Sequence, residues 1–494
     1  MVRGVLVVLA TFAVGCGALL GLDDYKDRQP PPTGSGGTTV STTSTGGTGG
    51  SGGSVVDAAW SIRFGTTGIT AATSVAVAEN GSIVVVGTFN SGFELDKPYV
   101  VSSEHIFVAK LDGATGKPVW SHIYDVGGST QPRVATDPGT AIYITGELHQ
   151  PMSFGGATLV HRGAGDIFLV ALSEAGDHLR SQSWGTQDGQ QVTTLAKDFA
   201  GDILVLSGGG ILLCGSYGAG DTGVFGFGNT MFQSYAVANA YVVRLNSDFS
   251  ENWVRVANPV PTATSTCHSL ALGSTGLFAA GTFTSGIVLD SITLTGSPLA
   301  SVFIASLDET SGAFVWASGF GSVAAQFPPS LAADGGGDPL LAGRAEGMID
   351  YGGQVDVIGE QGVWLSLVSF LNSSMGQARA GQRFGTGQGE LSVAADGSDV
   401  FVAGAFNNAI FGMGGMISSA GAGDVVVARM HLDPPEFAED WITTAGDTRD
   451  QRASDLALDS DSVIVVGSME GAMTLGDTLE AKGDRDAFVA KLPR

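Results

Sequence analysis

The sequence predicts an all-β fold, and three observations support this prediction. Gly occurs 75 times in 494 residues, which indicates many tight turns. The apolar segments are short and rich in β-branched residues, and turn pairs such as Asn80-Gly81 and Asp396-Gly397 separate them. No segment after residue 57 keeps the apolar period of a helix.

One unit recurs seven times between Trp60 and the C-terminus. Its clearest position is a Gly after a short apolar run, and these glycines lie 59 to 69 residues apart, at Gly87, Gly146, Gly215, Gly281, Gly343, Gly404 and Gly467. A second apolar run, such as Phe107-Val108-Ala109-Lys110, also has seven copies. A period near 60 residues with several short strands indicates propeller blades, whose faces are buried only by stacking.

Each unit predicts four antiparallel strands, a to d. In the first unit we expect strand a at 74–78, strand b at 83–89, strand c at 106–111 and strand d at 119–124. The predicted fold is therefore a seven-bladed β-propeller. A Gly in strand b suits a close approach of two backbones, where a side chain would clash.

The two ends of the repeat region predict how the ring closes. The chain ends at Phe488-Val489-Ala490-Lys491-Leu492, a strand c with no strand d after it. The region begins at Trp60-Ser61-Ile62-Arg63-Phe64-Gly65, a strand d with no blade before it. We expect the N-terminal strand to complete the last blade and remove the free edges.

The first residues predict export and a lipid anchor. Met1-Val2-Arg3 is a short basic start, residues 4–14 are apolar, and Gly15-Cys16 follows, which is typical of a signal peptide at 1–15. Ala13-Val14-Gly15-Cys16 resembles the lipobox of bacterial lipoproteins, in which the Cys carries the lipid. The alternative is an ordinary signal peptide that contains a Cys. Lipidation of Cys16 implies a membrane contact through acyl chains.

Residues 16–56 predict a tether, because Gly, Ser, Thr and Pro dominate them and cannot bury a core. Residues 57–494 then form the propeller. Units such as 74–89 together with 106–111 resemble the bacterial propeller repeats called SBBP repeats. The resemblance implies a propeller fold and a place in the cell envelope, with the outer membrane or cell surface favoured, and no shared catalytic residues.

The charge and the motifs exclude several functions. A formal net charge of −25 argues against nucleic-acid binding, which needs a basic surface. The seven His form no zinc-binding pair. The match of Gly218, Gly220 and Gly223 to a dinucleotide fingerprint has no βαβ unit around it. We therefore predict no cofactor, no metal and no catalytic residues, and a chain that is not an enzyme.

The candidate site residues lie in the third and fourth blades. Long b–c and d–a connections there carry aromatic residues that we expect to be exposed, and they form the candidate binding face: Phe225, Phe227, Phe232 and Tyr235. Cys214 and Cys267 lie at neighbouring blade positions, so they form either a disulfide or two separate buried thiols. Asp166, Asp424 and Asp486 recur before strand c, and we interpret that position as structural.

The function favoured by the sequence is an envelope protein whose non-catalytic propeller binds an unknown protein or a glycan. Two alternatives stay open: a propeller enzyme that acts on envelope or extracellular polysaccharide, and a purely structural envelope component.

Overall fold

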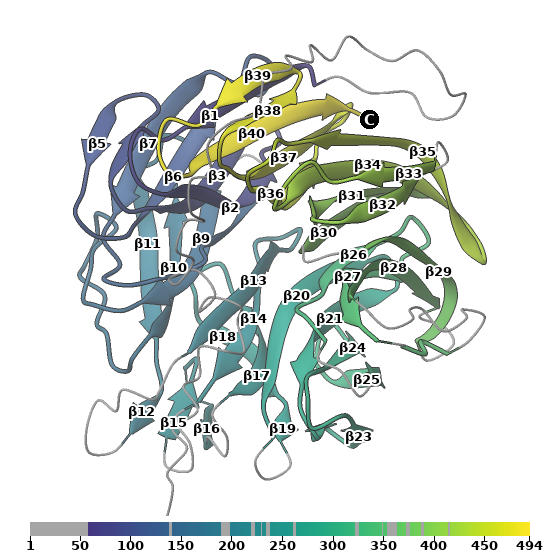
Figure 1. Ribbon diagram of the computed structural model, residues 1–494. Coiled ribbons are helices and arrows are strands. Elements are labelled where there is room, and N and C mark those ends of the chain that lie inside the picture. The colour runs from purple at the N-terminus through teal and green to yellow at the C-terminus, as the bar shows by residue number, and fades with distance from the viewer. Residues whose placement is uncertain are drawn as a thin grey trace, which may run out of the picture. The chain divides into compact units, whose positions relative to one another are not determined.

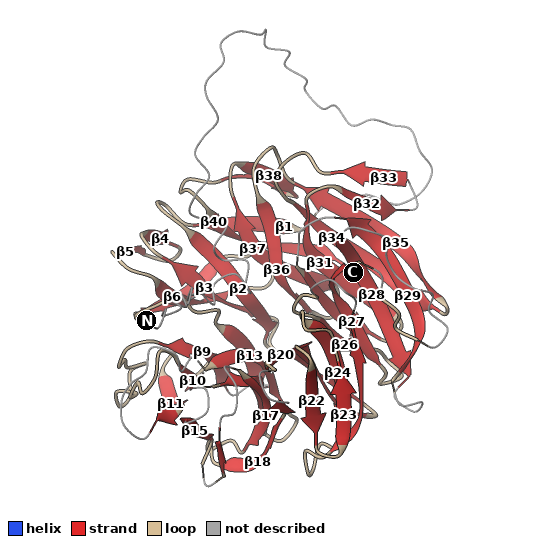
Figure 2. Cartoon of the chain, turned by 60° about the horizontal axis from the view of Figure 1, so that its bottom comes forward, coloured by secondary structure: helices blue, strands red, loops and turns tan. Residues whose placement is uncertain are grey.

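The computed structural model describes residues 58–137, 141–188, 198–218, 223–228, 230–233, 238–259, 263–321, 326–347, 349–352, 363–371, 376–386, 390–412 and 415–494. Its regular elements are all strands, and Figure 2 shows strands and loops throughout the described part of the chain. The predicted signal peptide (1–15), Cys16 and the tether (16–56) lie outside the described residues.

Seven antiparallel sheets form the described body. Six of them have the predicted four strands, and the fifth has six, because its strand d also pairs with a hairpin of the sixth blade. The a strands are β2 (Thr70–Val77), β8 (Arg133–Asp137), β13 (Phe199–Val205), β20 (Ser265–Gly273), β26 (Ser330–Ala333), β30 (Leu391–Asp396) and β36 (Gln451–Leu458). The b strands are β3 (Ile83–Phe89), β9 (Ala141–Leu148), β14 (Ile211–Tyr217), β21 (Gly276–Phe283), β27 (Pro339–Glu346), β31 (Asp399–Phe406) and β37 (Ser462–Met469).

The remaining two strands complete each blade. The c strands are β6 (His105–Leu111), β10 (Asp166–Leu172), β17 (Asn239–Leu245), β24 (Ser301–Leu307), β28 (Val363–Leu371), β34 (Asp424–Asp433) and β40 (Asp486–Pro493). The d strands are β7 (Pro118–Tyr124), β11 (His178–Trp184), β18 (Glu251–Val256), β25 (Phe314–Phe320), β29 (Gln377–Thr386), β35 (Glu436–Ala445) and β1 (Trp60–Phe64).

The sheets follow one another around a ring (Figure 1). Each a strand contacts the a strands of both neighbouring sheets, and β36 contacts β2, so the circuit closes. Seven apolar clusters fill the seven joints, each built from two adjacent sheets. The predicted β-propeller fold is thus confirmed, with its core divided among the joints between blades.

Closure uses the N-terminal strand. Strand β1 pairs with β40 in antiparallel register, from Trp60 opposite Lys491 to Phe64 opposite Ala487. The last sheet therefore has the order β36-β37-β40-β1. This is the pairing that the unmatched ends of the repeat region predict, with Ile62 opposite Val489.

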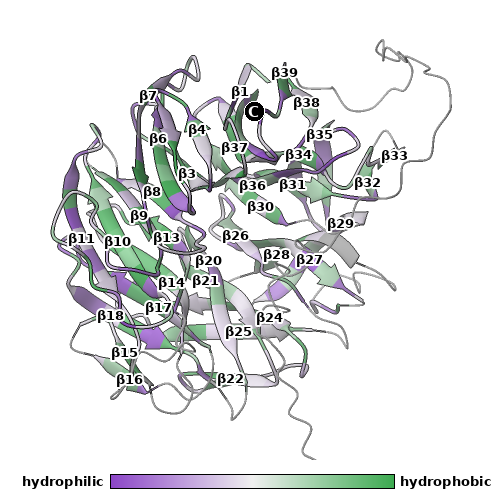
Figure 3. Cartoon of the chain, turned by 60° about the vertical axis from the view of Figure 1, so that its left-hand side comes forward, coloured by the Kyte–Doolittle hydropathy of each residue, from purple (hydrophilic) through white to green (hydrophobic). Residues whose placement is uncertain are grey.

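Burial explains the composition of the strands. Every residue of β9 is buried, whereas most of β11, on the outer edge of the same sheet, is partly or fully exposed. Figure 3 shows this gradient, with β9 and β10 largely hydrophobic and β11 largely hydrophilic. The b and c strands are covered on both faces, so they are almost continuously apolar.

Strand a differs from its prediction. Strand β2 begins at Thr70, whereas the sequence predicts its start at residue 74. Its pairing with β3 shifts register between Ala72 and Ser74, and this irregularity hides the first half of the strand from the sequence pattern. Thr73 is the extra residue of a β-bulge, and a bulge interrupts the alternation that marks a strand in sequence. Strands β13, β20 and β36 shift register at the equivalent position.

A polar position after the bulge connects the blades. Here a side-chain oxygen accepts the backbone N–H of the next a strand, as from Leu270 to Asp202 (2.8 Å) and from Val75 to Asp455 (3.1 Å). Ser74, Ser269 and Ser330 accept in the same way from Val134, Leu331 and Val393. The a strands of adjacent blades do not pair with each other as strands of one sheet do. These side-chain oxygens therefore accept backbone N–H groups that would otherwise have no partner.

Candidate functional site

The two ends of the ring carry different structures. One end, the turn face, consists of the a–b and c–d turns, such as 78–82 and 112–117. The other end, the loop face, consists of the d–a connections and the b–c hairpins. These hairpins are β4–β5 (Gly92–Glu94 and Pro98–Val100), β15–β16 (Gly223–Gly226 and Met231–Gln233), β22–β23 (Gly286–Leu289 and Ile292–Thr295), β32–β33 (Ala409–Gly412 and Gly415–Ser418) and β38–β39 (Ala472–Leu475 and Asp477–Glu480).

The hairpins join neighbouring blades. After strand d of the second blade, β12 (Gln187–Asp188) pairs with β15 of the third, and β19 (Asn258–Pro259) pairs likewise with β22 of the fourth. Strand β29 of the fifth blade pairs with β32 of the sixth. These pairings hold the described hairpins of the loop face against the neighbouring blades, which favours a rigid surface for binding at those hairpins.

The predicted exposure of Phe225 and Phe227 is wrong, because both side chains are at most 1% exposed. They belong to the apolar cluster between the second and third blades, where Phe225 stacks on Tyr217 with ring centroids 4.8 Å apart. Phe232 is only partly buried and packs against the same cluster, and Tyr235 lies outside the described residues. Phe225 and Phe227 thus hold the hairpin down and are not available to a ligand.

A repeated position explains this burial. Each blade places at least one apolar residue of its b–c connection in a joint cluster, and the equivalent residues are Phe93, Phe154, Phe225, Ile287, Ile349, Ile410 and Met473. The sequence carries the signal, since a short apolar pair such as Phe93–Leu95 or Ile287–Leu289 follows each strand b. A position with a copy in every blade serves the fold.

The aspartates before strand c are structural, as expected. Asp166 accepts backbone N–H bonds from Arg162 and Gly163, and Asp486 accepts them from Lys482 and Gly483. Asp424 accepts one from Ala420. These carboxylates close the end of the b–c connection by satisfying donors that no strand pairs.

Cys214 and Cys267 are both free and fully buried. They belong to the same apolar cluster between the third and fourth blades, and the Cys267 thiol donates to the Ser269 carbonyl at 3.8 Å. The structure thus corresponds to the thiol alternative rather than to the disulfide. Burial raises the pKa of the Cys214 thiol well above its ordinary value, so the reactive thiolate is disfavoured.

Asp198 is a fully buried carboxyl beside the start of β13. It accepts bonds from the Thr186 N–H and hydroxyl, both at 2.6 Å, and from the Gly218 N–H at 3.2 Å. Burial raises the pKa of Asp198 to about 7, against the lowering effect of these donors. A carboxyl with this pKa would suit acid–base chemistry, but its enclosure keeps substrates away and indicates a structural role.

Asp198 predicts a pH-dependent stability. Its folded pKa of about 7 lies above the ordinary 3.8, so its stabilisation is complete below about pH 4 and is lost as the pH rises through 7. Asp198→Asn should abolish this dependence. Relative to that variant, the wild type should lose up to about 4 kcal/mol of unfolding free energy between pH 4 and pH 8. Chemical denaturation across this range measures it. If the unfolding free energies of the wild type and Asp198→Asn changed in parallel with pH, the prediction would be contradicted. The control is Asp177→Asn, in an exposed turn, which should follow the wild-type profile.

The fifth blade departs from the repeat on the loop face. Its strand β26 has only four residues and follows Pro328-Pro329, which lack the N–H groups that a longer strand would use. In the first blade a Cβ at Gly87 would lie 2.0 Å from the Ala71 carbonyl, but at Gly343 the nearest atom is 3.6 Å away. The shortened strand therefore leaves room beside β27.

A pocket occupies this room, between the fourth and fifth blades. Its enclosed space is about 10 Å³, room for about one water molecule, within a wider opening of about 240 Å³ that includes open solvent. Its polar lining consists of Gln326, Arg344, Tyr351 and Ser366, and Phe327 contributes an aromatic ring. Burial raises the pKa of Tyr351 to about 12, so its hydroxyl stays neutral and able to donate.

Arg344 is the charged side chain in the lining of this pocket. Its guanidinium carbon lies 3.3 Å from the centre of the Phe327 ring, and its Nε is buried without a hydrogen-bond partner among the described residues. Burial lowers the pKa of Arg344, Glu390 and Glu346 act to raise it, and Arg452 acts to lower it. An arginine so placed retains hydrogen-bonding capacity for an anion.

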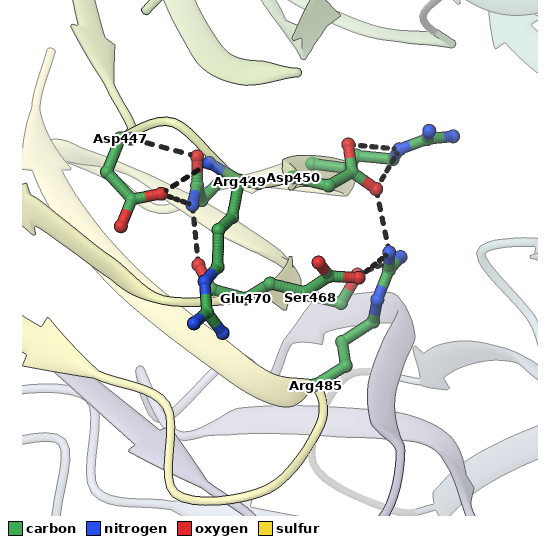
Figure 4. Close-up of polar contacts among 8 residues, drawn as sticks. Asp447, Arg449, Asp450, Ser468, Glu470 and Arg485 are labelled. Carbon is green, nitrogen blue, oxygen red and sulfur yellow. Dashed lines mark hydrogen bonds and ion pairs between the residues drawn. The ribbon is translucent and has the colours of Figure 1, made fainter. Parts of the chain in front are cut away.

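A second polar cluster lies on the loop face of the last blade (Figure 4). Arg485 donates to Asp450 and Glu470, both at 2.7 Å, while Asp450 also accepts from Arg452. Backbone bridges connect this cluster to both neighbours, from Arg485 to Ile69 and from Asp450 to Gly423. The paired charges stabilise the closing joint, whereas the Arg452 side chain remains half exposed.

Neither a membrane helix nor a metal site occurs in the part of the chain that the structure describes. No described helix is long and apolar enough to cross a membrane. No group of three or more His, Cys, Asp or Glu side chains among the described residues is placed to hold a metal ion.

Comparison with known proteins gives distant structural similarities. No family model and no curated protein match the chain. The solved structures that are similar to it include a quinohemoprotein alcohol dehydrogenase from Comamonas testosteroni, with 13% identity over 89% of this chain and 76% of that one and a TM-score of 0.43. They also include a GH43 endo-arabinanase from Bacillus licheniformis, with 10% identity over 58% of this chain and 91% of that one and a TM-score of 0.27. A third is the V. cholerae biofilm matrix protein Bap1, with 11% identity over 89% of this chain and 84% of that one and a TM-score of 0.22.

These comparisons correct one prediction. We expected a chain that is not an enzyme, but two of the similar structures are propeller enzymes, so the prediction is contradicted and we withdraw it. The propeller fold implied by the SBBP resemblance is present, whereas the repeat family itself stays a prediction. What the chain is shown to be is a β-propeller protein, a class that includes both enzymes and binding proteins.

Proposed function

We propose that this chain is a lipid-anchored envelope protein whose propeller binds a protein or glycan ligand on its loop face. The observation that supports the proposal is the narrow pocket around Arg344, where a blade departs from the repeat and leaves a partly buried charge at the loop face. Binding sites usually combine a rigid frame with such local departures. The lipobox-like Cys16 and the tether supply the envelope location.

Paired photo-crosslinking tests the binding face. Leu299, in the b–c connection of the fourth blade, is 49% exposed on the loop face, and Val315, at the start of β25 near the c–d turn, is 61% exposed. A photo-reactive residue at position 299 should form adducts with envelope proteins or glycans, and the same residue at position 315 should form few. The measurement is mass spectrometry of the adducts from the full chain in its native membrane.

Equal yields from both positions, or adducts from position 315 alone, would place the ligand elsewhere and refute the proposal. Because both sites belong to one blade and are similarly exposed, a difference reports on the face rather than on accessibility.

A further inference from the structure

His149 holds two connections of the second blade together on the loop face. It directly follows β9, and its ring nitrogens each lie 2.7 Å from a backbone carbonyl oxygen, Nδ1 from Ala164 and Nε2 from Ser129. A carbonyl oxygen can only accept, so both ring nitrogens must carry a proton and donate. A neutral imidazole has one N–H, whereas an imidazolium has two. The geometry around His149 is therefore that of the protonated ring.

The two bonds of the ring reach different segments. Ser129 belongs to the d–a connection 125–132, which leads into β8, whereas Ala164 belongs to the b–c connection of the same blade. The ring also packs on Gly128, where a Cβ would lie 2.8 Å from it, and the His149 N–H donates to the Val126 carbonyl at 2.8 Å. The protonated side chain thus ties the d–a connection to the b–c connection.

The repeat shows that this position holds the d–a connection in other blades too. The residue three positions after the glycine of strand b donates its backbone N–H to that connection in four of the blades, at Asn90, His149, Thr284 and Glu470. In the first blade the Asn90 Oδ1 also accepts the Ile69 N–H at 2.9 Å. In the fourth blade the Thr284 Oγ1 accepts the Thr264 N–H at the same distance. Asn and Thr do not titrate, whereas an imidazole ordinarily changes its charge between about pH 5 and pH 8.

Charged groups lie on the elements that pack against His149. Glu104, in the b–c connection of the first blade, accepts from the Thr130 N–H and the Ser129 hydroxyl, and burial raises its pKa while the charge of His149 lowers it. An ionised Glu104 therefore favours the imidazolium. The other titratable or charged groups on these elements are Asp125, Glu147, His161, Arg162 and Asp166. Of these, Glu147 and Asp166 already accept backbone N–H groups, from Gln131 and Ala200 and from residues 162 and 163.

We propose that His149 is a proton-operated latch on the loop face of the second blade. The protonated ring holds the d–a connection 125–132 against the b–c connection. When the pH rises and one ring proton is lost to solvent, a nitrogen lone pair faces a carbonyl oxygen at 2.7 Å, so one of the two bonds breaks and the connection loosens. The side chain is only partly buried, so water reaches it. The inference does not rest on the proposed function.

Hydrogen–deuterium exchange of the full chain, at about pH 5.5 and about pH 8, tests the latch. Protection of the amides in 125–132 is compared with protection in 65–69, the equivalent connection that Asn90 holds, because this ratio removes the intrinsic effect of pH on exchange. We expect the ratio to fall about tenfold between the lower and the higher pH, as for the loss of one hydrogen bond from a charged donor. His149→Asn, which copies the first blade, should abolish the fall.

Glu104→Gln is the matched control, because it removes the neighbouring titration and keeps an oxygen that accepts from Ser129 and Thr130. The fall should persist in this variant. Ionisation of Glu104 would act in the opposite direction, since the carboxylate that forms as the pH rises is the stronger acceptor. The sign of the change therefore distinguishes the imidazole from the carboxyl.

A ratio that stays constant with pH in the wild type would overturn the inference. So would a fall that persists in His149→Asn, or one that disappears in Glu104→Gln. If thermal unfolding shows that His149→Asn does not fold, His149→Gln takes its place and must also abolish the fall.

Discussion

Replacing Phe64 by Ala should lower the free energy of unfolding by about 3–5 kcal/mol. Phe64 is 1% exposed on the closing strand β1, and its ring packs edge-on against Phe93 and Phe107 of the first blade, with centroids 5.8 and 5.4 Å apart. The substitution leaves a cavity in the joint between the last and first blades. Equilibrium denaturation with urea measures the loss.

The matched control is Val119→Ala, because Val119 is 57% exposed on strand β7 of the same blade and should change the stability by less than about 0.5 kcal/mol. If Phe64→Ala and Val119→Ala behaved alike, the closing strand would not contribute to stability, and the ring would be held by its other joints alone.

Replacing Cys16 by Ser should move the protein from the membrane fraction to the soluble fraction. Acyl chains contribute about 0.8 kcal/mol for each buried CH₂ group, so two or more chains retain a protein firmly on a bilayer. Fractionation after export, with mass spectrometry of the N-terminal peptide, measures both the location and the lipid.

Thr42→Ala, in the predicted tether, is the control and should remain with the membrane. A wild-type protein that is already soluble after export would refute the anchor, as would a Cys16→Ser protein that has lost residues 1–15 and still stays in the membrane fraction.

The repeat explains why much of the fold is predictable from sequence. Strand β3 has the predicted bounds, 83–89, because a buried strand between turns gives an uninterrupted apolar run. The pairing of β1 with β40 follows from two incomplete units at the ends of the chain. Strand β2 is mispredicted at its start because the bulge at Thr73 places two consecutive residues on one side.

The candidate site is less predictable, because exposure depends on which segments fold over one another. Phe225 was expected to be exposed since its loop is long, yet the hairpin β15–β16 turns back onto the joint and buries the ring. The apolar residue after each strand b was the available signal. The sequence signal for the pocket at Arg344 is weaker. The pair Pro328-Pro329 predicts that strand a of the fifth blade is short, but it does not predict which side chains line the space beside it.

The two cysteines illustrate the same limit. Their positions in adjacent blades predict proximity, which the shared cluster bears out, but the distance between two sulfur atoms depends on how the sheets pack. Sequence spacing therefore leaves bonded and free thiols undecided, and the structure shows free ones.

The central claim is that the loop face is the binding face, and the ratio of crosslinking yields from positions 299 and 315 tests it most directly. Both positions lie in the fourth blade, so fold, tether and expression are shared. We predict that adducts from position 299 exceed those from position 315 by at least tenfold, and that an excess of the partner identified in those adducts suppresses them. A ratio near one, or a ratio in the opposite direction, would contradict it.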